Sequence, residues 1–168
     1  YCTIKKTAYV LRISFRPDRT HAHLLAEVDF VRYLFEHGAP VCPPVASRDN
    51  NLVERISVSG RELYAVVFPK AAGIRLPDNG YRYRDGVPLT EYYTNYGKTL
   101  GLLHRLSKSY VASANDICRP DWLQTMRDER IASCLPVEKT VLRMVLTNIC
   151  DQVLALPQTR ESFGLLHA

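Results

Sequence analysis

The sequence has no apolar run long enough to cross a membrane as a helix, a length of ~20 residues. Hydrophobic residues make up 46% of the 168 positions and charged residues 23%, an ordinary balance for a globular protein in water. An initiator Met is also missing, and the first residues lack the basic-then-apolar order of a secretory signal. We therefore expect a cytoplasmic protein without a membrane partner, and a start of this kind is typical of the middle of a longer chain.

Cysteine pairs with metal-ligand spacing are also missing, because the five cysteines contain no C-x-x-C motif. The cysteines are widely separated and odd in number, so we interpret them as reduced thiols of a cytosolic protein. Long runs of Lys or Arg are missing too, although the formal net charge of +5 favours anionic partners. We expect no nucleic-acid partner, and phosphorylated small molecules are the partners that this charge favours.

The pattern of the sequence changes once, near residues 69–85. Before the change, short runs rich in Val, Ile, Tyr and Phe lie between turn residues and predict an antiparallel sheet. These runs are Ala8 to Ser14, Leu52 to Ser59 and Glu62 to Phe68. One helix, from about His21 to His37, interrupts them and ends at Gly38 with Pro40 just beyond.

After the change, the apolar residues recur at helical spacing. The predicted helices are Leu89 to Tyr110, Pro120 to Leu135 and Val137 to Leu156. We therefore expect an α+β fold with two lobes. A small antiparallel-sheet lobe with one helix covers residues 1–69, a hinge and linker cover residues 70–88, and the first part of a helical lobe covers residues 89–168.

Two charged residues stand where burial is expected. Arg12 interrupts an apolar strand and, by the alternation of strand side chains, shares a face with Val10. Glu27 lies three residues after Leu24 and four before Val31, on or beside the apolar stripe of the predicted helix. Because an unpaired buried charge is costly, we expect Arg12 and Glu27 to face each other.

Two interpretations of this pair are open. A cation on a central strand, held by a helix carboxylate, is the arrangement with which protein-kinase-like folds bind the α- and β-phosphates of ATP. The carboxylate orients the long cationic side chain and limits its freedom. The other interpretation is a structural ion pair, or an arginine whose head group reaches the edge of the sheet.

Five blocks of the sequence, in matching order and spacing, resemble the aminoglycoside phosphotransferase and choline kinase family. The blocks are Tyr9 to Ser14, Ala26 to Phe30 with Gly38 to Val41, Tyr64 to Gly73, Leu100 to Leu106 and Gly164 to Ala168. This resemblance implies a protein-kinase-like fold, in which a nucleotide-binding lobe precedes a helical lobe.

The resemblance assigns roles to residues of the first lobe. It implies that Arg12 contacts the nucleotide phosphates and that Glu27 pairs with Arg12. It also implies that the backbone around Phe68, Pro69 and Lys70 is the hinge that receives adenine. Because Pro69 has no N–H, the adenine hydrogen bonds are expected at carbonyls and at the N–H of Phe68 or Lys70.

The resemblance also identifies the last five residues as the approach to the catalytic loop. His167 would open this loop and orient it by hydrogen bonding. The catalytic Asp and the metal-binding Asn and Asp would follow Ala168, so we assign no metal ligand within the 168 residues. ATP or GTP, together with Mg²⁺, are the cofactors that the resemblance implies.

The implied function is transfer of the γ-phosphoryl group to a hydroxyl of a small molecule. Aminoglycosides, choline or ethanolamine, homoserine and sugar-like compounds are all open as acceptors, although an Arg at position 12 is more similar to the choline-kinase and homoserine-kinase branches. A second interpretation is a non-catalytic, truncated or degenerate kinase-like module that binds a nucleotide or a partner chain. The resemblance places the phosphate-covering loop before or within Tyr1 to Thr7, and the absence of glycine from these residues favours the second interpretation. A third is an unrelated α+β binding domain. The sequence does not indicate an oligomeric state.

Overall fold

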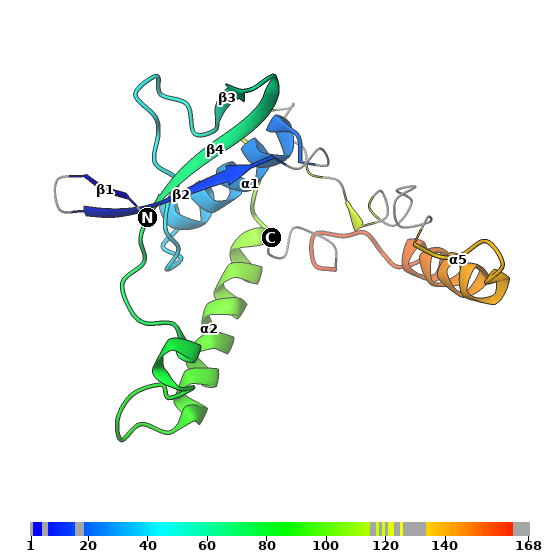
Figure 1. The fold of residues 1–168 in the computed structure, drawn as a ribbon. Helices are drawn as coiled ribbons and strands as arrows, with labels where there is room; N and C mark the ends of the chain where they lie inside the picture. Colours follow the sequence, from blue (N-terminus) through cyan, green and yellow to red (C-terminus); the bar gives the residue numbers. More distant parts are fainter. Residues whose placement is uncertain are drawn as a thin grey trace.

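The computed structural model describes residues 2–4, 7–15, 19–114, 117, 119, 121–122, 125 and 134–162. These residues have the α+β arrangement that the sequence predicts (Figure 1). An antiparallel sheet carries a helix on one face, and further helices follow the last strand.

Four strands form the sheet in the order β1-β2-β4-β3, and each pairs antiparallel with its neighbour. The strands are β1 (Cys2–Ile4), β2 (Thr7–Ser14), β3 (Glu54–Val58) and β4 (Arg61–Pro69). Ser59 and Gly60 join β3 to β4 with φ angles of 51° and 75°, the left-handed values that a two-residue hairpin turn needs. The central strands are therefore β2 and β4, which carry the candidate site.

Helix α1 (His21–Glu36) packs one face against the sheet. The Thr20 hydroxyl accepts a hydrogen bond from the backbone N–H three residues later and so caps the first turn. Gly38, with φ 83°, takes the left-handed conformation that ends many helices. Leu24 and Val28, one helical turn apart, are 1% and 0% exposed. They form the core under the sheet with Val53 and Val66.

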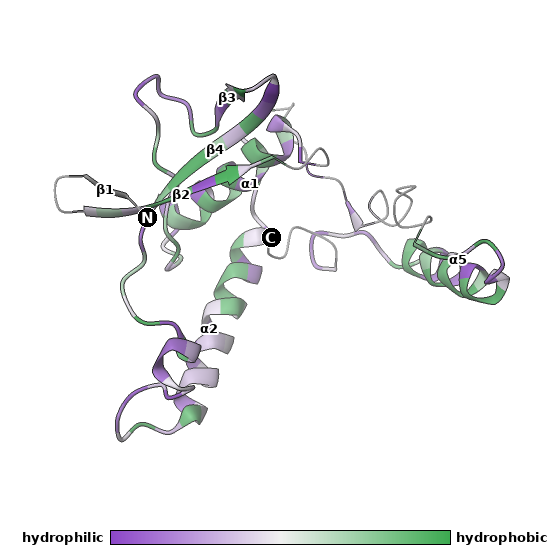
Figure 2. Ribbon diagram, in the orientation of Figure 1, coloured by the Kyte–Doolittle hydropathy of each residue, from purple (hydrophilic) through white to green (hydrophobic). Residues whose placement is uncertain are grey.

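Among the described residues, two long α-helices follow the sheet. They are α2 (Leu89–Ser107) and α5 (Thr140–Leu154), with a short 3-10 helix η1 (Leu76–Asn79) ahead of α2. Both lie within predicted helices, whereas most of the helix predicted over residues 120–135 lies outside the described residues. Figure 2 shows that α5 is mainly hydrophobic. In the part of the chain that the structure describes, no helix has the length and apolarity of a membrane span.

A second buried cluster connects α1 to the end of α2. Its buried members are Phe30, Leu34 and Ala39, all at most 5% exposed. Leu103 and Leu106 of α2 pack against them. Helix α1 is therefore held on one side by the sheet and on another by the C-terminal turns of α2.

Candidate functional site

The site is built around an ion pair between β2 and α1. Arg12 lies opposite Val66 of β4, and opposed residues of an antiparallel pair share a face of the sheet. Since Val66 is in the core with α1, Arg12 leaves the sheet on the side of the helix. Its Nη1 donates to Oε1 of Glu27 across 2.5 Å. The predicted pairing of Arg12 with Glu27 is confirmed, and its role toward a nucleotide stays a prediction.

Glu27 has a second cationic neighbour that the sequence did not reveal. Nη1 of Arg19 lies 3.5 Å from Oε2 of Glu27, so each carboxylate oxygen faces one guanidinium. The Glu27 side chain is only 12% exposed. Arg19 directly precedes the Thr20 cap and belongs to no strand or helix, which is why no periodic pattern indicated it. The carboxylate is thus fixed from two sides.

The Arg12 guanidinium carries hydrogen-bond donors beyond those that Glu27 uses. Its Nε and Nη2 are buried, and no acceptor in the described part of the chain bonds to them. The ring of Phe68 in β4 lies close by, with its centroid 5.5 Å from Arg12 Cζ, a distance typical of a cation–π contact. A guanidinium held in this way matches the oxygens of a phosphate, which accept paired hydrogen bonds. These residues therefore fit a nucleotide phosphate.

The direction of the backbone at the end of β4 follows from two hydrogen bonds. The Lys70 N–H donates to the Ala8 carbonyl across 2.9 Å, which extends the ladder between β2 and β4. On the opposite side, the Val67 carbonyl accepts from the Val45 N–H across 2.8 Å. Successive strand residues direct their backbone groups to alternate sides. The Pro69 carbonyl therefore points away from β2.

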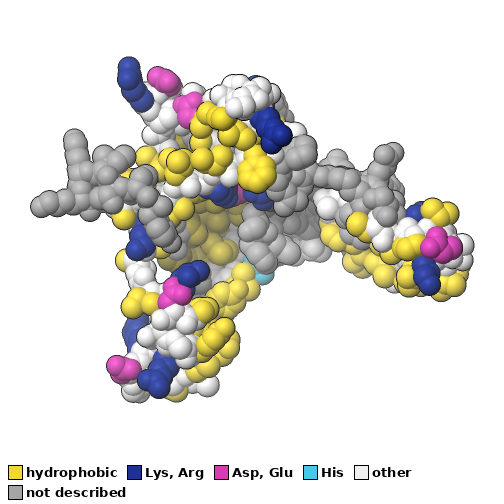
Figure 3. All heavy atoms as spheres, in the orientation of Figure 1, with side chains coloured by type: hydrophobic (Ala, Val, Ile, Leu, Met, Phe, Trp, Pro, Cys, Tyr) yellow, Lys and Arg dark blue, Asp and Glu magenta, His cyan; other side chains and the backbone are white. Residues whose placement is uncertain are grey.

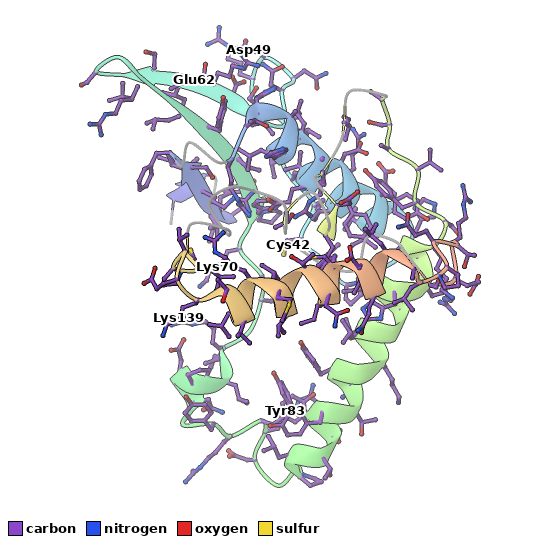
Figure 4. All side chains as sticks on the ribbon, turned by 90° about the vertical axis from the view of Figure 1, so that its right-hand side faces the viewer. Cys42, Asp49, Glu62, Lys70, Tyr83 and Lys139 are labelled. Carbon is purple, nitrogen blue, oxygen red and sulfur yellow. The ribbon has the colours of Figure 1, made fainter. Side chains whose placement is uncertain are left out.

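This geometry corrects one expectation about the hinge. The Lys70 N–H is wrong as an adenine donor, because it already bonds to Ala8. The Phe68 N–H points toward β2 by the same alternation, opposite Val10. Of the backbone groups of Phe68, Pro69 and Lys70, the Pro69 carbonyl points away from β2. Figure 4 labels Lys70, which lies where the chain leaves the sheet toward η1 and α2.

The face of the molecule seen in Figure 3 is hollowed between the sheet and α2. Basic side chains lie on the sheet side of this hollow, and hydrophobic side chains line much of the rest. A phosphate group is anionic and a purine ring is largely apolar. The two kinds of surface therefore have the chemistry for a ligand with an anionic end and an apolar end.

A buried carboxylate lies behind the ion pair, at the junction of α1 with the segment after α2. Oδ2 of Asp29 accepts hydrogen bonds from the Tyr110 hydroxyl at 2.7 Å and from the Ser113 N–H at 3.1 Å. Nη2 of Arg32 donates to the other oxygen, Oδ1, at 2.8 Å. Burial alone would raise the pKa of Asp29, but the hydrogen bonds from Ser113 and Tyr110 and the charge of Arg32 lower it below its usual value.

We expect the pH dependence of stability to reflect this junction at both ends of the scale. The lowered pKa of Asp29 means that its contribution is present above the unfolded value of ~3.9 and is lost as the pH falls further. Burial, the Asp29 hydrogen bond and the Asp29 charge raise the pKa of Tyr110. Its contribution is therefore complete below about pH 10 and is lost as the pH rises.

Urea midpoints of the intact protein across this pH range test the assignment. Asp29→Asn should flatten the decline below about pH 4, and Tyr110→Phe should flatten the decline above about pH 10. Asp78→Asn is the matched control. Asp78 and Asp29 each form an i,i+3 ion pair with an arginine, but the Asp78 side chain is exposed and the Asp29 side chain is buried. If the urea midpoint changes with pH in the same way in the wild type and in all three variants, the expectation is contradicted.

The predicted catalytic loop begins at His167. Within the described ranges, no three His, Cys, Asp or Glu side chains lie together so that they could hold a metal ion. His167 lies outside the described residues, as do its neighbours from residue 163 onward. Its predicted orienting role therefore stays a prediction.

Comparisons with known proteins identify the family of this chain. Residues 1–168 match the model of a family described as the phosphotransferase enzyme family. An amicoumacin kinase from Bacillus subtilis is 23% identical over 168 residues, 99% of this chain. An uncharacterised protein from Synechocystis is 32% identical over 65 residues, 39% of this chain and 18% of its own length.

A solved structure has the same fold. An amicoumacin kinase in complex with AMP-PNP, Ca²⁺ and Ami superimposes with a TM-score of 0.81 and 24% identity over 99% of this chain. The predicted protein-kinase-like fold is therefore confirmed. The chain spans about half of the amicoumacin kinases that it matches, 48% of each.

Proposed function

Because the chain belongs to the phosphotransferase enzyme family, we propose that the intact protein transfers the γ-phosphoryl group of ATP or GTP to a hydroxyl group of a small molecule. The observation that carries this proposal is the Arg12–Glu27 pair with the two unused guanidinium donors. A cation that is fixed in position and still has free donors is suited to bind phosphate oxygens.

Each residue of the site has a proposed role. Arg12 binds the phosphates of the nucleotide, and Glu27 fixes the Arg12 guanidinium through a hydrogen bond of 2.5 Å. Phe68 packs against the same guanidinium and restricts its movement. The Pro69 carbonyl, which points away from β2, accepts a hydrogen bond from the adenine amine, and Lys70 continues the hinge. These roles bind and position the nucleotide, and the acceptor is activated elsewhere.

A divalent cation, Mg²⁺ in this proposal, would neutralise the charge that develops on the transferred phosphoryl group. The solved relative binds AMP-PNP together with Ca²⁺, which supports the use of a nucleotide and a divalent ion in this family. The metal ligands of the intact protein are expected outside the described residues. His167 is proposed to orient the catalytic loop.

The acceptor is proposed at two levels. The family match supports phosphoryl transfer. We propose a hydroxyl-bearing small molecule as the acceptor, a class that includes aminoglycosides, choline or ethanolamine, homoserine and sugar-like compounds. Two of the matched proteins are named amicoumacin kinases, which adds amicoumacin to the panel of candidates. At 23–24% identity the acceptor is a matter for experiment.

The test is a phosphoryl-transfer assay on the intact protein with Mg²⁺. ATP and GTP are each combined with the acceptor panel, amicoumacin first, and the phosphorylated acceptor is measured by mass spectrometry. AMP-PNP in place of ATP is the control that binds without transfer. A protein that binds neither nucleotide would overturn the proposal. Nucleotide binding without transfer to any acceptor would support the alternative, a non-catalytic kinase-like module.

A further inference from the structure

Helix α1 carries two buried carboxylates on opposite sides. Glu27 and Asp29 are two residues apart, which separates their side chains by about 200° around a helix. Glu27 faces Arg12 on β2, and Asp29 faces Tyr110 and Ser113 after the end of α2. They are 9% and 5% exposed. The helix is therefore tied to the sheet by one acidic side chain and to the following lobe by the other.

The Asp29 side of this arrangement is made of several contacts. Three donors converge on the Asp29 carboxylate, from Arg32, Tyr110 and Ser113. The Tyr110 ring packs edge-on against Phe30 and Tyr33 of α1, with centroids 4.9 and 5.2 Å apart. Such contacts between aromatic rings favour one relative orientation.

A further hydrogen bond connects α1 to α2, one helical turn after Asp29. The Tyr33 hydroxyl donates to the Leu106 carbonyl across 3.2 Å. Rotation or sliding of α1 would break this bond and those to Asp29 together. The junction therefore defines both the rotation and the position of the helix along its axis.

We infer that Asp29 is a positioning residue for nucleotide binding, which acts through α1 on Glu27 and so on Arg12. The inference rests on the proposed function of the ion pair. The hydrogen bond between Arg12 and Glu27 tolerates little displacement, because hydrogen bonds weaken steeply when their angle departs from linearity. When the Asp29 junction is loosened, Glu27 moves relative to β2, and the Arg12 donors lose the orientation that suits the phosphates.

A purely structural role for Asp29 predicts something different. In that case, substitution lowers the melting temperature and leaves the nucleotide affinity of the folded protein unchanged. Action through Glu27 instead predicts that the loss of affinity depends on the Glu27 charge. A double-mutant cycle separates the two, because residues that act independently have additive effects and linked residues do not.

The cycle uses the intact protein and AMP-PNP as the probe, below the lowest melting temperature of the set. Its four members are the wild type, Asp29→Asn, Glu27→Gln and the double variant. Asp29→Asn alone should raise the dissociation constant roughly three- to thirtyfold, which lies within the range that coupled residues show. The same substitution in the Glu27→Gln background should change it less than about twofold. Asp78→Asn, at the exposed pair with Arg75, should leave affinity unchanged.

Each outcome decides the question. Wild-type affinity in Asp29→Asn, or the same fold-loss in both Glu27 backgrounds, would overturn the inference and leave the proposed function standing. A wild-type protein that does not bind AMP-PNP would overturn the proposed function, and the inference with it. If Asp29→Asn does not fold, Tyr110→Phe replaces it in the cycle, because this change removes only the hydroxyl that bonds to Asp29. Wild-type affinity in Tyr110→Phe, or the same fold-loss in both Glu27 backgrounds, would then overturn the inference.

Discussion

The Arg12→Ala variant of the intact protein should bind ATP roughly 30- to 300-fold more weakly than the wild type. The substitution removes the guanidinium whose Nε and Nη2 are proposed to bind the phosphates, and truncation of a charged group in such a contact has effects of this size. The fold should persist, because Glu27 keeps Arg19 as a cationic neighbour and the Arg12 side chain is already 33% exposed. Titration with AMP-PNP and a thermal melt measure the two quantities.

Two further variants make this prediction specific. Glu27→Gln should weaken binding less than Arg12→Ala, because the amide still offers an oxygen to Arg12 but lacks the charge. Arg55→Ala is the matched control, since Arg55 is an exposed arginine on β3 of the same sheet. It should leave affinity unchanged. Large and equal losses of thermal stability in Arg12→Ala and Glu27→Gln, with unchanged affinity, would instead identify a structural ion pair.

The sequence predicted the features of this site that depend on local periodicity. Strand alternation placed Arg12 on one face, and helical spacing placed Glu27 beside the apolar stripe of α1. The cost of burying either charge alone then implied their pairing, and the structure has it. Each step needed only residues that are close together in the chain and the general rule that buried charges are paired.

The features that the sequence did not predict depend on contacts between distant residues. Asp29 and Tyr110 are 81 positions apart, so no local pattern joins them. The unavailable N–H of Lys70 depends on the register of β2 against β4, which places Lys70 opposite Ala8. A one-residue shift of this register would reverse which hinge groups face outward. The clearest available signal for the junction was a second acidic residue, Asp29, within the apolar stretch of α1.

The proposed nucleotide site lies beside a small buried core, and Leu24→Ala should show how much this core contributes to stability. Leu24 is 1% exposed and packs with Val28 and Val66 between α1 and the sheet. Its truncation leaves a cavity and should lower the free energy of unfolding by about 2–5 kcal/mol, measured by urea unfolding. Leu11→Ala is the matched control, because Leu11 is 48% exposed on the other face of β2. It should lower this free energy by about 1 kcal/mol or less. Equal losses of unfolding free energy in Leu24→Ala and Leu11→Ala would show that Leu24 is not a core residue. Because this core holds α1, with Glu27, against the sheet, with Arg12, Leu24→Ala should also weaken nucleotide binding at temperatures where the protein begins to unfold. Arg12→Ala should weaken binding in the fully folded protein.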